Sequence, residues 1–240
     1  MTAKLQGEEK SVYVQDMFGR IARRYNLMNR VMTFGQDQRW RRYLVKQADL
    51  PENGRLLDLA TGTGDIAFEA LHAVPSTQVV GADFSLPMMR VGQEHALGEF
   101  VQWCGADALN LPFPDNTFDA VASGYLMRNV IDIERTLAEQ LRVLKPGGRV
   151  VILDSSPPPR NTLRPFILIH LKFIIPLLGR IIGGKNAADA YRYLPESTQA
   201  FKTPEELAEL MRAAGIKNVQ FKKFMLGTIC VHWGTKNSHR

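Results

Sequence analysis

Apolar side chains recur at helical intervals over the first part of the chain. Between residues 8 and 48 they repeat every three or four positions, which is the spacing of an amphipathic helix. One helical face contains Val14, Phe18, Ile21 and Tyr25, and a second contains Trp40, Leu44 and Val45. Pro51 and Gly54 then end this region, so the sequence predicts a helical arm over residues 1–50.

Beyond residue 55, short apolar runs alternate with helical stretches. The runs are continuous and rich in Val, Leu and Phe, as is typical of strands buried on both faces. They cover residues 56–60, 79–82, 100–104, 118–122 and 150–153. The clearest intervening helix spans 132–144 and ends at Lys145-Pro146-Gly147-Gly148. Strands that alternate with helices predict a doubly wound, mostly parallel α/β sheet.

The alternation stops at Asp154 and is followed by an apolar and basic segment over residues 162–185. A helix is expected over 204–214, with Thr203 as its N-cap. Two short strands, 217–224 and 227–234, then predict an antiparallel hairpin at the sheet edge, with Ile229, Val231 and Trp233 on one face.

These elements predict one Rossmann-like α/β domain with seven strands. Within it we expect a substrate arm (1–50), a cofactor-binding core (51–154), a helical lid (155–202) and a helix and hairpin that complete the sheet (203–240).

Composition fits a globular protein and narrows its chemistry. Hydrophobic residues make up 45% and charged residues 22%, which excludes a disordered or collagen-like chain. Cys104 and Cys230 lie outside any CxxC pattern, and the five histidines have no metal-ligand spacing, so we expect neither disulfides nor a metal. Without a secretory apolar run or an uninterrupted apolar span, we expect a cytoplasmic protein with no transmembrane helix.

Positive charge is concentrated in two segments. The formal net charge is +6. Residues 20–46 hold eight basic side chains and one acid, Asp37, and residues 160–192 hold six basic side chains and one acid, Asp189. The rest of the chain is net acidic, so the basic segments point to an anionic partner, either a membrane surface or a nucleic acid.

The segment LDLATGTGD, residues 57–65, is typical of a buried strand that runs through a glycine turn into a helix. Glycines let backbone N–H groups approach a ligand closely, although many such turns contain glycine only for steric reasons. Asp83 ends the next strand, where an acid binds a ribose diol. Together the turn and the acid predict a nucleotide-like cofactor.

The kind of cofactor follows from the turn, which reads A-x-G-x-G-D rather than the dinucleotide pattern G-x-G-x-x-G. The carboxylate of Asp65 would repel a pyrophosphate but not the sulfonium and ammonium groups of S-adenosylmethionine, the expected cofactor. Asp107 and Ala108 follow the third strand, where they meet the adenine edge or where Asp107 merely caps a turn.

Further motifs extend over nearly the whole chain. They are Tyr25-Asn26-Leu27-Met28-Asn29, Trp40-Arg41, LPFPDNTFD (111–119), Arg128-Asn129-Val130, RVLKPGG (142–148), YLPES (193–197) and His232-Trp233-Gly234. With this set in this order, the chain resembles class I S-adenosylmethionine-dependent methyltransferases. More narrowly, it resembles the C-methyltransferases of menaquinone and ubiquinone biosynthesis.

The resemblance implies that Thr63 contacts the cofactor, that Asp83 binds its ribose and that Gly124 lies near the sulfonium. The cofactor-binding residues expected altogether are Asp58, Ala60, Gly62, Thr63, Gly64, Asp83, Phe84, Asp107, Ala108 and Gly124. The resemblance also implies that Tyr25, Arg128 and Asn129 face a quinol and are the catalytic residues.

The chain departs from the family pattern at two places. Asn26 stands where the family usually has aspartate after the tyrosine, and Leu126 stands where it usually has glycine. The second change adds a side chain beside the reacting site and leaves the head group of the quinol open.

A mechanism follows if the acceptor is a hydroquinone. A phenol has a pKa near 10, and a neighbouring cation favours its phenolate, which activates the adjacent ring carbon. We expect Arg128 to stabilise that oxyanion, Tyr25 and Asn129 to orient the ring hydroxyls, and a water to accept the proton. Alternatively, Arg128 pairs with Asp132, its i,i+4 neighbour.

Residues 162–185 bear on where the acceptor is found. Their apolar side chains exceed a narrow helical stripe and are interrupted by Arg164, Lys172, Arg180 and Lys185. This suits a lid over an isoprenoid tail that rests on anionic headgroups at the inner face of the membrane, and the alternative is a core helix.

Two other classes of function stay open. A basic arm on a methyltransferase core could modify RNA or DNA, although no Asn/Asp-Pro-Pro-Tyr element follows the fourth strand. A cofactor-binding domain that has lost its catalytic activity would bind S-adenosylmethionine but transfer no methyl group. The expected function is methylation of demethylmenaquinol or a ubiquinone precursor, with a prenylated quinol, a membrane surface and a second copy of the chain as partners, and no nucleic acid.

Overall fold

A single sheet of seven strands organises the molecule in the computed structural model, which describes residues 7–183 and 190–238. The strand order is β3-β2-β1-β4-β5-β7-β6. The strands are β1 (Arg55–Leu59), β2 (Gln78–Asp83), β3 (Val101–Gly105), β4 (Phe118–Gly124), β5 (Leu144–Ser155), β6 (Lys217–Phe224) and β7 (Ile229–Thr235). The five strands β1 to β5 pair in parallel, and β7 is antiparallel to both β5 and β6. This confirms the predicted fold class.

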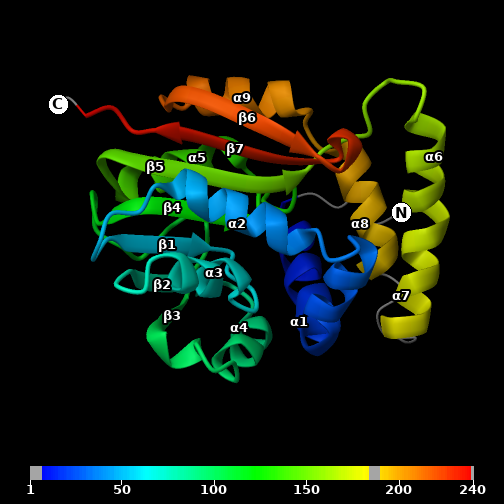
Figure 1. The fold of residues 1–240 in the computed structure, drawn as a ribbon, viewed down its shortest axis with the longest axis horizontal. Coiled ribbons are helices and arrows are strands. Elements are labelled where there is room, and N and C mark those ends of the chain that lie inside the picture. The colour runs from blue at the N-terminus through cyan, green and yellow to red at the C-terminus, as the bar shows by residue number, and fades with distance from the viewer. Residues whose placement is uncertain (1–6, 184–189, 239–240) are drawn as a thin grey trace.

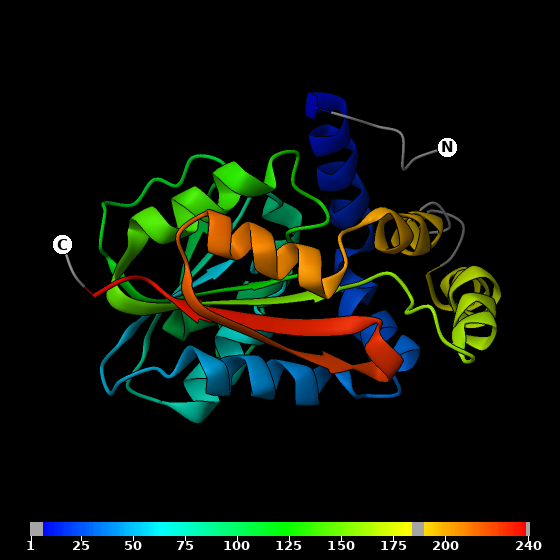
Figure 2. The same cartoon turned by 90° about the horizontal axis from the view of Figure 1, so that it is seen from above.

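Helices cover both faces of this sheet (Figures 1 and 2). One face packs against α2 (Asp37–Ala48) and α3 (Asp65–Ala73), with Trp40 and Leu44 fully buried. The other face packs against α5 (Ile133–Val143) and α9 (Pro204–Ala213), through Leu137, Leu207 and neighbouring side chains. The inward positions predicted for α2 are therefore confirmed.

A third group of helices lies beyond the carboxyl ends of the parallel strands (Figure 1). It consists of α1 (Gly7–Met32), α6 (Arg164–Ile169), the π-helical turn η3 (His170–Ile174), α7 (Ile175–Gly183) and α8 (Ala190–Ala200). Their shared core includes Val14, Met28, Ile167, Leu171 and Tyr193. These helices therefore cover the carboxyl edge of the sheet, where open α/β folds bind ligands.

The C-terminal elements follow the prediction in detail. Thr203 caps α9 as half of a capping box with Glu206. The hairpin of β6 and β7 turns through the short 3-10 helix η5 (Met225–Gly227), and Ile229 and Val231 face the α2 side of the sheet. Strand β6 forms the sheet edge, and β7 lies between β6 and β5.

Three elements differ from the expected pattern. Strand β5 starts at Leu144, because the Lys145-Pro146-Gly147-Gly148 segment bulges out between the pairs Phe118–Leu144 and Ala120–Arg149. Phe100 belongs to the 3-10 helix η2 (Gly98–Phe100) rather than to β3. Helix α8 lies within the predicted helical lid, but no separate helix was expected there, since Pro195 lies inside it and a proline removes a helical hydrogen bond.

Helix α8 is held by tertiary contacts instead. The Ser155 and Thr198 hydroxyls lie 2.9 Å apart in a hydrogen bond, and Tyr193 is almost fully buried. The remaining helix is α4 (Leu86–Gln93). Within residues 7–183 and 190–238, no helix has the length and apolar character needed to cross a membrane.

Candidate active site

The side chain of Asp58 holds the glycine turn after β1 through hydrogen bonds. This fully buried carboxylate accepts hydrogen bonds from Thr61 Oγ1 (2.7 Å) and from the backbone N–H of Ala67 (3.1 Å). Gly64 has a φ of +84°, and a Cβ there would lie 2.8 Å from both Phe68 and Trp103. Asp58 and Gly64 therefore fix the conformation of the turn rather than line a cavity.

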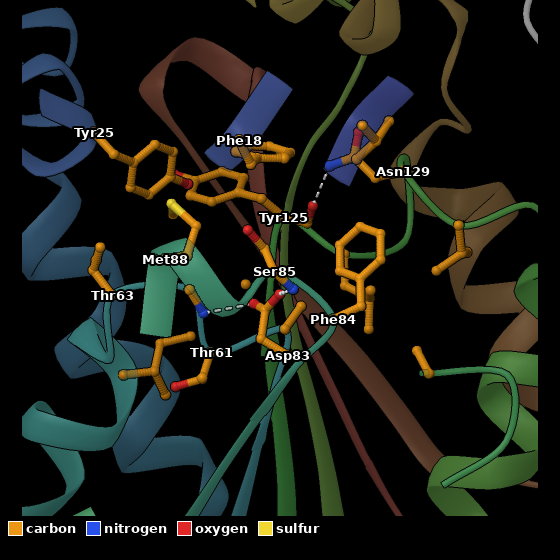
Figure 3. Close-up of a pocket in the computed structure, with 18 of the residues that line it drawn as sticks. Phe18, Tyr25, Thr61, Thr63, Asp83, Phe84, Ser85, Met88, Tyr125 and Asn129 are labelled. Atoms are coloured by element: carbon orange, nitrogen blue, oxygen red, sulfur yellow. Dashed lines mark hydrogen bonds between the residues drawn. The ribbon is translucent and has the colours of Figure 1, made fainter. Parts of the chain in front are cut away.

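Asp83 lies at the end of β2 and faces the turn (Figure 3). Its carboxylate accepts the backbone N–H of Gly62 (2.7 Å) and that of Ser85 (2.8 Å), and it has no ion-pair partner among residues 7–183 and 190–238. Burial raises its pKa to about 6. Each oxygen retains acceptor capacity, so Asp83 can still accept hydrogen bonds from a diol.

These groups border a first cavity of about 120 Å³ at the carboxyl edge of the sheet. The Ser85 hydroxyl lines it, is buried and has no hydrogen-bond partner within the described part of the chain. Predicted site residues that line this cavity are Tyr25, Ala60, Gly62, Thr63, Asp83, Phe84, Asp107, Ala108, Gly124 and Asn129. Asp107 also caps its turn by accepting the N–H of Leu109 (2.9 Å), as the alternative predicted, while its contact with an adenine edge stays a prediction.

The environment of Asp65 differs from the expectation. Its carboxylate pairs with Arg41 (2.9 Å) and accepts a hydrogen bond from Asn26 Nδ2 (3.2 Å). Arg41 therefore offsets part of the negative charge from which the preference for a cationic cofactor was predicted. Asn26 also accepts a hydrogen bond from Thr63 Oγ1 (2.8 Å), so an amide at this position joins α1 to the glycine turn through one donor and one acceptor.

A second cavity of about 290 Å³ lies under α6, η3 and the tip of the hairpin. Most of its lining is apolar and includes Phe166, Leu171 and Ile229. Tyr25 and Tyr125 line both cavities and so form their common boundary. Figure 3 shows the two side chains in the first cavity. Tyr125 has an unusual φ of +59° and donates its N–H to Leu153 O (2.7 Å), which directs the loop after β4 across this boundary.

Arg128 lies in the wall of the second cavity, not the first. Its Nη1 binds Asp154 Oδ1 at 2.7 Å, with both side chains buried, and the guanidinium lies over the Tyr125 ring at 4.8 Å. The alternative pairing with Asp132 is wrong, because Asp132 instead caps α5 through the N–H of Arg135. Arg128 Nε is buried and finds no hydrogen-bond partner among the described residues.

The loop that carries Arg128 is held from two sides. Asn129 donates to Tyr125 O (2.7 Å) and accepts from the Tyr193 hydroxyl of α8 (3.0 Å). On the other side, Lys10 of α1 donates to the carbonyls of Arg128 (3.1 Å) and Val130 (3.0 Å). The sequence offered one signal for Tyr193, the YLPES motif, but none for Lys10 or Asp154.

The two basic segments have different environments. In the first, Arg41 is buried against Asp37 and Asp65, and Arg23 pairs with Glu94 on the surface. In the second, Arg164 and Lys172 are exposed. Lys185 and Asp189 lie outside the described residues.

The segment from α6 to α7 combines the two readings of its sequence. Ile167, Leu171 and Ile175 are buried in the third core, as expected of a core helix. On its other face it exposes large apolar side chains, namely Phe166 (70%), Ile169 (51%), Phe173 (68%) and Leu177 (57%). Singly exposed apolar residues are ordinary, whereas an aligned set rimmed by cations is typical of an interaction surface.

Comparisons with known proteins agree on one family. The model of the ubiE/COQ5 methyltransferase family matches residues 5–236. A ubiquinone/menaquinone biosynthesis C-methyltransferase UbiE of Desulfotalea psychrophila is 53% identical over 223 residues, which cover 93% of this chain and 90% of the relative. A demethylmenaquinone methyltransferase of Thermus thermophilus is 44% identical over 92% of this chain and its own full length.

Solved structures share the fold at lower identity. A SAM-dependent methyltransferase from Thermotoga maritima superposes with a TM-score of 0.63 at 21% identity, covering 92% of this chain and 99% of that one. A phosphoethanolamine N-methyltransferase of Haemonchus contortus in complex with S-adenosyl-L-methionine gives 0.61 at 17% identity, over 83% and 52% of the two chains.

Proposed function

Because the chain belongs to the ubiE/COQ5 methyltransferase family, we propose that it transfers a methyl group from S-adenosylmethionine to a ring carbon of a prenylated hydroquinone, with demethylmenaquinol as the preferred acceptor. The observation that carries this proposal is a pair of adjoining cavities that share Tyr25 and Tyr125 as a wall. One is bordered by the polar groups of Asp83 and Ser85, and the other is lined mostly by apolar side chains. S-adenosylmethionine in the first cavity and the hydroquinone ring in the second would lie next to each other at that wall.

The residues of the first cavity fit S-adenosylmethionine. The sulfonium of S-adenosylmethionine supplies an electrophilic methyl group. The Asp83 carboxylate suits a ribose diol, as does the Ser85 hydroxyl, which has no partner among the described residues. Gly62 leaves room for the ligand, because a Cβ added at this position would lie 3.2 Å from Cε of Met88. Asp107 and Ala108 suit the adenine edge. These assignments place the methyl group toward Gly124 and the tyrosine boundary.

Arg128 acts on the acceptor as a positioned hydrogen-bond donor. Asp154 balances its charge and holds the guanidinium in place, so its unpaired Nε–H is the group available to a ring oxygen. A hydrogen bond to the charged form favours the phenolate. The pKa of Tyr25 is raised by burial, which keeps its hydroxyl protonated as a second donor. Asn129, engaged by Tyr125 and Tyr193, orients the loop rather than the ring directly.

The prenyl tail of the acceptor occupies the apolar cavity and leaves it under α6 and η3. The exposed Phe166 and Phe173 on these elements, with Arg164 and Lys172 beside them, support the proposal that this face rests on anionic headgroups of the membrane. The protein is then peripheral, at the cytoplasmic side. The homodimer expected from the sequence stays a prediction, which light scattering of the purified protein tests.

Incubation of the purified protein with labelled S-adenosylmethionine and a panel of acceptors tests the proposal. Prenylated naphthoquinols and benzoquinols, a tail-less naphthoquinol, tRNA and duplex DNA form the panel. We expect label in the prenylated quinols, weak transfer to the tail-less ring and none to nucleic acid. Transfer to tRNA or DNA alone would establish the nucleic-acid alternative, and cofactor binding without transfer to any acceptor would establish the non-enzymatic one.

A further inference from the structure

The wall of the second cavity includes a histidine, His170, in addition to Arg128 and the tyrosines. Its lining is mostly apolar, but His170 lies among Phe166, Ile167 and Leu171 on the same segment. His170 Nε2 is buried and has no hydrogen-bond partner in the described part of the chain. Buried polar atoms are nearly always paired, so an unpaired one in a cavity wall is suited to a polar group of a ligand.

The backbone at His170 is specialised. A π-helical turn begins at this residue, and the N–H of Ile175 closes it by donating to the carbonyl of His170. Pro176 follows directly, has no N–H of its own and would clash with a carbonyl one turn earlier in a regular helix. The wider turn accommodates Pro176 and begins at His170. Such turns occur often at functional sites.

The protonation state of His170 suits a neutral ligand group. Burial lowers its pKa from the ordinary value of 6.5, so the ring is neutral at physiological pH. A neutral imidazole has one donor and one acceptor nitrogen, so Nε2 can pair with a hydroxyl or with a carbonyl. Both the reduced and the oxidised form of a quinone ring offer such a group.

Arg128 Nε and Asn29 Nδ2 are two further buried atoms of this lining that have no hydrogen-bond partner among the described residues, and Arg128 comes from a different wall, the loop after β4. A hydroquinone ring carries two oxygens on opposite sides. We propose that His170 is a second anchor of the acceptor ring: its Nε2 hydrogen-bonds the ring oxygen remote from Arg128, while Arg128 binds the oxygen next to the methylated carbon. This inference rests on the proposed function and adds a positioning residue to it.

A cycle of substrates and variants tests the inference. The two acceptors are a prenylated 1,4-naphthoquinol and the matching prenylated naphthol that lacks only the oxygen remote from the methylated carbon. The variants are His170→Phe, which keeps a flat ring without nitrogen, His170→Gln, which keeps a hydrogen-bonding group, and the exposed His72→Gln as control.

For the unaltered protein, we expect KM to be about tenfold lower for the quinol than for the naphthol, the value of one hydrogen bond. His170→Phe raises KM for the quinol by that factor, leaves KM for the naphthol and the Kd of S-adenosylmethionine unchanged, and alters kcat less than KM. His170→Gln recovers most of the difference, and His72→Gln behaves as the unaltered protein.

Equal KM values for both acceptors in the unaltered protein, or an equal rise for both in His170→Phe, would overturn the inference and assign His170 to packing. Failure of the proposed function looks different, because the unaltered protein would then methylate neither acceptor while still binding S-adenosylmethionine. The His170 inference would fall with it.

Discussion

Asp58 is the residue whose ionisation is most strongly coupled to folding in the cofactor turn. Burial raises its pKa to about 7. In the unfolded chain an aspartate titrates at about 4, so between about pH 4 and 7 the folded state keeps a proton that the unfolded state releases. The free energy of unfolding contributed by this group therefore falls as pH rises through that window.

We predict that Asp58→Asn removes this part of the pH dependence, because the amide oxygen still accepts from Thr61 and Ala67 but does not titrate. Urea unfolding between pH 4 and 8 measures it. The unaltered protein should lose up to roughly 1.4 kcal/mol per pH unit relative to the variant across the window. Parallel stability curves would show that Asp58 is ionised throughout.

Arg128 is the residue on which the chemistry depends most directly. Arg128→Lys keeps a cation for Asp154 but loses the forked donor set, so we expect kcat at saturating quinol to fall by about two orders of magnitude. Raising the pH should restore part of this loss in the lysine variant, because the phenolate then forms in solution. Arg128→Ala should in addition lower the melting temperature, since it leaves Asp154 buried without a partner. Normal turnover in both variants would contradict the assignment.

Single residues were predictable from the sequence only where a local motif places them. Gly62 and Thr63 lie in the turn of a strand-turn-helix unit, and Asp83 ends the strand that follows it, so their position at the sheet edge is known from the pattern. The partner of Arg128 was not predictable, because sequence spacing offers only the helical neighbour Asp132, whereas Asp154 reaches Arg128 across the parallel pairing of β4 and β5. Contacts made by sheet pairing have no local signature.

Helix α1 is the element that couples the cofactor cavity to the substrate side. Asn26 ties it to Thr63 and Asp65, and Gln15 donates to Phe84 O at 2.7 Å. These bonds hold α1 over the cavity whose wall it supplies through Val14, Phe18 and Tyr25. A loose α1 should therefore weaken cofactor binding.

Asn26→Leu, which removes both side-chain hydrogen bonds at similar volume, should raise the Kd of S-adenosylmethionine about tenfold, as measured by calorimetry. Leu27→Asn is the matched control on the same helix, because Leu27 is exposed and the substitution is the reverse one. An unchanged Kd in Asn26→Leu would mean that α1 does not contribute to holding the cofactor.

Elements were predicted best where their residues share one environment. Continuous apolar runs marked β1, β2 and β4 to within a few residues, because central parallel strands are buried on both faces. Helix α8 was missed because its local preference opposes a helix at Pro195, and burial of Tyr193 against α1 overrides that preference. The segment from α6 to α7 was ambiguous because one face is core and the other is exposed.

At the scale of the whole molecule, the net charge of +6 has two separate explanations. Part of the first basic segment is turned inward, where Arg41 pairs with Asp37 and Asp65 and Arg30 also pairs with Asp37. The second segment places exposed cations beside exposed Phe166 and Phe173. The excess positive charge therefore favours a lipid surface over a nucleic acid.

We predict that the protein partitions onto anionic vesicles at low salt and that the double substitution Phe166→Ser and Phe173→Ser lowers this partition at least about tenfold. Phe100→Ser is the control, because Phe100 is 58% exposed but lies in η2, away from α6. Sedimentation with vesicles measures the bound fraction. Equal partition of the double variant and the control, or none by the unaltered protein, would contradict the proposed membrane face.

The central claim is transfer of a methyl group to a ring carbon across the boundary formed by Tyr25 and Tyr125. Incubation with S-adenosylmethionine that carries a trideuterated methyl group and with prenylated 1,4-naphthoquinol, followed by mass spectrometry and NMR of the product, tests it most directly. We expect one labelled methyl group bonded to the ring carbon beside a hydroxyl. A label on oxygen, or an unlabelled quinol beside a bound cofactor, would contradict it.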